Sequence, residues 1–149
     1  MSMNWKIAQS ICNKITRKCP IGTFRSKLTK EPESEFALQT RYGVFFGIGN
    51  HDPNGTALGK VVCSNYESAI QNHICGHVRF LNFNSEQERY NAWQSYLTKF
   101  ARFCVMIDES TKLAPYMDDY SEPWTDKRFK EYFGLTDIEW QLIDTVIKD

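Results

Sequence analysis

The stretch that decides the fold is PWTDKRFKEYFGLTDIE at residues 123–139. Threonine is a common cap at helix N-termini, and glycine often ends a helix, so Thr125 and Gly134 predict a short helix between them. Thr136 and Glu139 stand three residues apart in the pattern of a capping box, which predicts a second helix starting there. We therefore expect a pair of short helices joined by a tight link.

A longer helical pattern precedes this pair. Ser85 and Glu88 form another capping-box pattern. After them the large apolar residues recur on one stripe, which comprises Trp93, Leu97, Phe100, Cys104 and Ile107. Burying such a side chain contributes roughly 1.5–3 kcal/mol, and the pattern predicts one long amphipathic helix.

The first half of the sequence adds a helix and several strands. Asn4 is a plausible cap for a helix with Ile11 and Ile15 on its apolar face, ending before Cys19 and Pro20. Residues 36–48, 60–63 and 74–83 are rich in aromatic and β-branched residues and predict short strands. The fold class is therefore α+β, with a small mixed or antiparallel sheet, one long amphipathic helix and a C-terminal helical pair. We expect one domain over 1–149, with a basic helix and loop at 1–35, a β-rich part at 36–83 and a helical part at 85–149.

Composition points to a folded protein of the cytoplasm. The 149 residues are 42% hydrophobic, and no run of about eighteen apolar residues or export signal is present. Five cysteines without a CxxC pair argue against a disulfide framework and against common zinc modules. We expect a reducing cytoplasmic location.

Charge is unevenly distributed although the formal net charge is zero. Residues 1–30 hold seven basic residues and no acidic one, whereas residues 105–149 hold eleven acidic and five basic residues. One interpretation is a face for a polyanion and another for solvent or a protein partner. The other is that the two ends of the sequence pack on each other.

Catalytic signatures are weak throughout the sequence. His73, Cys75 and His77 alternate on a predicted strand, but one strand splays its side chains too far apart for tetrahedral metal binding. A cysteine nucleophile at Cys63 with His51 or His73, and a nuclease or other hydrolase in residues 51–77, remain weaker alternatives. Phosphate-binding, dinucleotide-binding and amino-methyltransferase tetrapeptide motifs are missing from the sequence. We expect no catalytic residue, no cofactor and no metal.

Nucleic-acid binding has a better basis in the residue types. The candidates for phosphate contacts are Arg25, Lys27, Arg41, Lys60, Lys99 and Arg102. The candidates for contacts with base edges, on Gly-rich or polar loops, are Asn50, His51, Asn54 and Asn65. These ten residues form the predicted DNA-binding set.

Several short motifs occur in the order found in one enzyme family. They lie at residues 20–26, 42–60, 98–103 (TKFARF), 124–126 (WTD) and 133–136 (FGLT). In this series the sequence resembles the C-terminal target-recognition domain of adenine-specific (N6) DNA methyltransferases and single-chain restriction-modification enzymes. The resemblance implies a non-catalytic module that recognises double-stranded DNA and works with a methyltransferase or restriction subunit, whose Rossmann-like domain holds the methyl donor.

One departure from the family pattern suggests a different partner. Between residues 103 and 124 relatives carry a longer basic stretch with Phe-Val-Pro, whereas this sequence has Asp108, Glu109, Asp118 and Asp119. Phosphate contacts are disfavoured by such acids. The alternative function is therefore a protein-binding inhibitor or regulator of a restriction or host defence enzyme, as in phage anti-restriction, built on the same scaffold.

Overall fold

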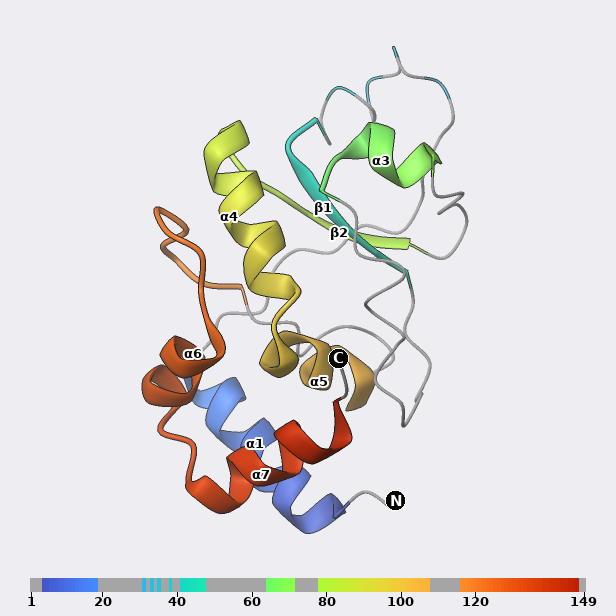
Figure 1. Ribbon diagram of the computed structural model, residues 1–149. Helices are drawn as coiled ribbons and strands as arrows, with labels where there is room; N and C mark the ends of the chain where they lie inside the picture. The colour runs from blue at the N-terminus through green and yellow to red at the C-terminus, as the bar shows by residue number, and fades with distance from the viewer. Residues whose placement is uncertain are drawn as a thin grey trace.

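The computed structural model describes residues 4–18, 31, 33, 35, 38, 41–47, 64–71, 78–107 and 116–147. Within them the fold is mixed α+β and mostly helical, with six helices and one two-stranded antiparallel sheet. The sheet and a short helix lie at one end of the molecule, four helices gather at the other, and α4 (Glu86–Tyr96) runs between the two ends (Figure 1). The α+β prediction is confirmed.

The sheet pairs β1 (Gly43–Gly47) with β2 (Val78–Asn82) in antiparallel register, with Val44 opposite Leu81. Val44, Phe45 and Leu81 are buried, which anchors the pair in the core. Both α4 and α3 (Tyr66–Gln71) contact β1. Helix α3 begins where the sequence predicted only a polar stretch between strands, because Asn65 caps it by accepting a hydrogen bond from Ser68 N at 2.8 Å. The predicted strand at 60–63 lies outside the described residues.

The predicted long helix is two helices, α4 and α5 (Lys99–Ile107). Helix α4 ends at Tyr96 with Leu97 as its C-cap, and Thr98 caps the start of α5 by accepting a hydrogen bond from Ala101 N at 3.2 Å. The stripe is therefore divided: Phe100 and Cys104 are buried, while Trp93 and Leu97 are only half-buried. Besides the core residues Ala92 and Tyr96, α4 buries polar groups, including Asn91 and Ser95.

The last two helices, α6 (Asp126–Phe133) and α7 (Asp137–Val146), confirm the predicted helical pair. They pack with α5 and with α1 (Trp5–Lys18), which begins after Asn4 as predicted. Helix α1 buries Ala8, Ile11 and Ile15. Helices α1 and α7 thus lie side by side (Figure 1), which agrees with the second interpretation of the charge asymmetry for the parts of the two ends that the structure describes.

Aromatic rings form the centre of the helical end. Phe100 stacks on Phe129 and Phe133 with ring centroids 4.8 and 5.2 Å apart, and Trp124 stacks on Phe129 at 5.1 Å. Such ring pairs add to the stabilisation that burial provides. Within the described part of the chain, no helix is both long enough and apolar enough to cross a membrane.

Candidate functional site

The family-like motif at 124–126 is part of the scaffold. Trp124 is buried, and its backbone N–H donates to Ser95 Oγ at 2.7 Å while its indole Nε1 donates to the carbonyl of Asp119 at 2.8 Å. Thr125 caps α6 by accepting from Arg128 N at 3.2 Å. These residues have partners inside the protein, and they position the helices.

Asp126 joins this motif to the motif at 98–103. Its carboxylate accepts hydrogen bonds from Lys99 N at 3.3 Å and Phe100 N at 2.9 Å, so it satisfies two N–H groups in the first turn of α5. Asp126 also lies in the first turn of α6. One carboxylate therefore fixes the start of α5 against the start of α6.

The motif at 133–136 makes the link between α6 and α7. Phe133 and Leu135 are buried, and Gly134 adopts the left-handed conformation, with φ of 64°. Gly134 N donates to the carbonyl of Glu131 at 3.3 Å and Leu135 N to that of Lys130 at 3.0 Å, which is a Schellman ending. Thr136 and Glu139 then form the predicted capping box.

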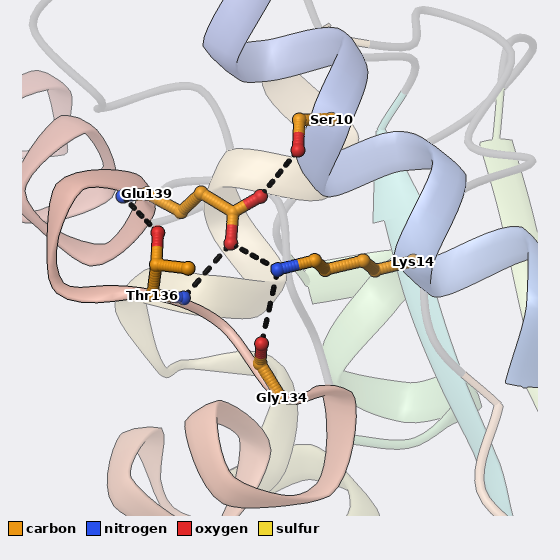
Figure 2. A network of polar contacts seen from close by, with 5 residues as sticks. All are labelled: Ser10, Lys14, Gly134, Thr136 and Glu139. Carbon is orange, nitrogen blue, oxygen red and sulfur yellow. Dashed lines mark hydrogen bonds and ion pairs between the residues drawn. The ribbon is translucent and has the colours of Figure 1, made fainter.

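Glu139 also joins α7 to α1 (Figure 2). Only 4% of this residue is exposed. Its carboxylate accepts hydrogen bonds from Lys14 Nζ at 2.5 Å, Ser10 Oγ at 2.6 Å and Thr136 N at 2.8 Å, and Lys14 Nζ also donates to the carbonyl of Gly134 at 3.0 Å. Burial raises the pKa of the Glu139 carboxyl, but the hydrogen bonds from Lys14, Ser10 and Thr136 outweigh burial and lower the pKa to about 2. The group is ionised at neutral pH and serves as a structural clamp.

Four residues of the predicted DNA-binding set lie in the described part of the chain, and they do not form one site. Lys99 pairs with Asp144 of α7 at 2.8 Å, and Arg102 Nε donates to the Thr98 carbonyl at 3.3 Å, so both also serve the helical end. Asn65 caps α3, near the sheet at the opposite end (Figure 1). Arg41 stacks on the Tyr42 ring at 5.0 Å, just before β1.

The other six predicted residues lie outside the described residues: Arg25, Lys27, Asn50, His51, Asn54 and Lys60. So do the weaker catalytic and metal candidates His73, Cys75, His77 and Cys63. Among residues that the structure does describe, no three His, Cys, Asp or Glu side chains gather closely enough to hold a metal ion.

Helix α1 presents a polar face that the prediction overlooked. At 100° per residue, Lys6, Gln9, Asn13 and Arg17 lie on the side of the helix opposite its buried residues, and all four are exposed. Gln9 Nε2 donates to Asn13 Oδ1 at 3.0 Å, between the two cations. The spacing of Lys6 and Arg17 along the axis is roughly 16 Å. We call these four residues the α1 polar face.

The chemistry of the α1 polar face suits a nucleic acid. Lysine and arginine bind phosphates or guanine edges, glutamine and asparagine bind adenine edges, and a helix fits the major groove. Helix α1 contains no acidic residue that would repel phosphates. This face could have been predicted from the sequence, because polar residues recur at positions 6, 9, 13 and 17, which is the spacing of one side of a helix.

A second surface feature has the opposite charge. An open hollow of about 560 Å³ lies between residues 117–124 and α6. Its lining comprises Met117, Asp118, Asp119, Trp124, Arg128, Glu131 and Tyr132. We call it the acidic hollow, because three of its residues are carboxylates and one is a cation.

No protein-family model, curated protein or solved structure matches this chain.

Proposed function

We propose that this chain is a non-catalytic DNA-recognition module of the target-recognition type, which contacts duplex DNA through the α1 polar face. The observation that carries the proposal is the exposure of Lys6 and Arg17 on either side of the Gln9–Asn13 pair, on a helix without acids. This arrangement combines phosphate-binding cations with amides that read base edges. Methyl transfer or cleavage would belong to a methyltransferase or restriction partner.

The roles of the family-like motifs support the proposal. Their residues cap helices or fill the core, as Asp126, Gly134 and Thr136 do. A scaffold built from these motifs presents other residues to DNA. The α1 polar face and, from the predicted set, Arg25 and Lys60 are the groups proposed for that role.

The test is duplex binding measured by fluorescence anisotropy over a range of salt concentrations. Affinity should fall as salt rises, since each phosphate contact releases counterions. Lys6→Ala and Arg17→Ala should each weaken binding and reduce the slope of log K against log salt by about 1. Arg25→Ala and Lys60→Ala should weaken binding too.

The matched control is Lys127→Ala, which removes an exposed cation from α6. Its salt slope should equal that of the unaltered protein. Equal slopes for Lys6→Ala, Arg17→Ala and the unaltered protein would contradict contact through α1.

The second candidate function is a protein-binding inhibitor or regulator of a restriction or defence enzyme. The acidic hollow favours it, because an acidic surface repels nucleic acid and attracts basic protein surfaces. The tagged chain should then retain a defence or host enzyme from a lysate equally well before and after nuclease treatment. Under the first function, a methyltransferase or restriction subunit is retained only while DNA is intact.

A further inference from the structure

The acidic hollow has an aromatic floor and charged walls. Trp124 is 5% exposed and meets Tyr132 edge-to-face, with ring centroids 5.3 Å apart. Asp118, Asp119 and Glu131 are exposed around these rings.

The wall formed by residues 117–124 is held by buried hydrogen bonds. Asn91 Nδ2 donates to the carbonyl of Tyr120 at 2.8 Å, and Met117 N donates to the hydroxyl of Tyr120 at 3.1 Å. The hydrogen bond from Trp124 N to Ser95 Oγ fixes the other end of the segment. A surface held in place before binding loses little conformational entropy when a partner arrives.

The protein's own Arg128 and Phe129 already cover the Trp124 ring, so Tyr132, which is 39% exposed, is the aromatic ring open to a partner. The guanidinium carbon of Arg128 lies 3.7 Å from the centroid of the Trp124 ring, in a cation–π arrangement. The single positive charge of Arg128 neutralises the negative charge of only one of the three carboxylates. Lys18 approaches the Tyr132 ring at 5.1 Å and adds a second cation, but the three carboxylates still outnumber the two cations, so the hollow keeps an excess of negative charge.

Asp119 stays ionised over a wide pH range. The backbone N–H of Ser121 donates to its carboxylate at 2.8 Å and holds the pKa of that carboxyl below its ordinary value. The charge excess therefore persists at neutral pH.

We propose that the acidic hollow binds an arginine side chain on a basic segment of a partner protein. A planar guanidinium can stack on the half-exposed Tyr132 ring and bond to carboxylates through its fork of N–H donors, whereas a lysine ammonium lacks this shape. The carboxylates repel the phosphates of a nucleic acid. The occupant is therefore a cationic protein segment. This inference rests on the second candidate function and is independent of DNA contact through α1.

The test uses a fluorescein-labelled peptide of alternating glycine and arginine, with lysine and glutamine versions for comparison. Anisotropy with the full chain should show binding of the arginine peptide ahead of the lysine peptide, and no binding of the glutamine peptide. The double variant Asp118→Asn with Glu131→Gln should weaken binding of the arginine peptide at least about tenfold. These two side chains are exposed, so the fold should be retained.

The matched control is Glu33→Gln with Glu67→Gln, which removes the same charge from exposed positions outside the lining and outside residues 117–124. The control should bind within about twofold of the unaltered protein, because distant exposed charges are largely screened by salt. An equal loss in both double variants would overturn the proposal, since the attraction would then come from overall charge.

A second measurement does not depend on variants. The ¹H–¹⁵N resonance of the Trp124 indole should shift as the arginine peptide is added. Peptide binding that leaves this resonance unmoved would overturn the proposal. If the chain captures a protein partner after nuclease treatment but does not bind the arginine peptide, the hollow is not the binding site, and the second candidate function still stands. Duplex binding tests the first function separately.

Discussion

Glu139 should make the free energy of unfolding depend on pH in a defined acidic range. The unfolded carboxyl takes up a proton near pH 4.5, whereas the folded one does so only near pH 2. The stabilisation is therefore complete above about pH 4.5 and is lost as the pH falls towards 2. The difference in pKa corresponds to about 3 kcal/mol at neutral pH, of which about 2 kcal/mol is lost at pH 3.

The perturbation is Glu139→Gln, examined by urea unfolding at pH 7 and pH 3 with circular dichroism. Glutamine cannot ionise. The free energy of unfolding of the variant should therefore fall less between pH 7 and pH 3 than that of the unaltered protein, by about 2 kcal/mol. Glu122→Gln is the control, because this exposed residue lies outside the Glu139 network. Equal losses for Glu139→Gln and the unaltered protein would refute the reasoning.

Lys14 supplies a second measurement on the same clamp. Lys14→Met leaves the buried Glu139 carboxylate without its cation and should cost about 3 kcal/mol, at the low end for broken buried pairs because the Lys14 side chain is 26% exposed. The melting temperature should fall by roughly 6–12 °C. In the double variant Lys14→Met with Glu139→Gln, the loss of stability should differ from the sum of the two single losses. A loss equal to that sum would show that the two residues are not coupled.

Three further changes test the helix ends and the buried hydrogen bonds. Gly134→Ala should lower the free energy of unfolding in urea by about 1–2 kcal/mol through the positive φ at this position alone, since a Cβ there meets nothing within 4 Å. Gly134→Asn should lower it less. A larger loss for asparagine than for alanine would contradict a cost that comes from the backbone conformation. Asp126→Ala should cost about 1–2 kcal/mol by leaving Phe100 N uncapped, with faster amide hydrogen exchange at the start of α5 as its signature. Ser95→Ala should cost about 1–3 kcal/mol because the buried Trp124 N–H loses its acceptor; thermal melting within 1 °C of the unaltered protein would count against this role.

The helix ends could be predicted from the sequence because capping is local. Asn4, Thr125 and Thr136 each accept a hydrogen bond from an N–H three residues ahead, so the pattern is visible in a short window. The break at Thr98 was missed because the apolar stripe continues through it and hides the new cap. Helix α3 was missed because six residues are too few to show a clear helical period.

The candidate sites depend on contacts that no short window contains. Lys14 and Glu139 are 125 residues apart, and Lys99 meets Asp144 across 45 residues. Lys99 was therefore predicted as a phosphate ligand although it pairs with a carboxylate in the folded chain. The α1 polar face, by contrast, follows from helical spacing and could have been found by asking which cations lie opposite Ile11 and Ile15.

The packing of α1 on α7 has a consequence for how the protein is made. The apolar face of α1 leaves the ribosome long before α7, the helix that covers it, because Lys14 of α1 and Glu139 of α7 are 125 residues apart in the chain. Until then Ile11 and Ile15 lack their final partner, and contacts so distant in sequence form slowly. A nascent chain halted before α7 would expose this apolar face to chaperones and proteases, so a premature stop within residues 137–146 should deplete the protein as effectively as an early one.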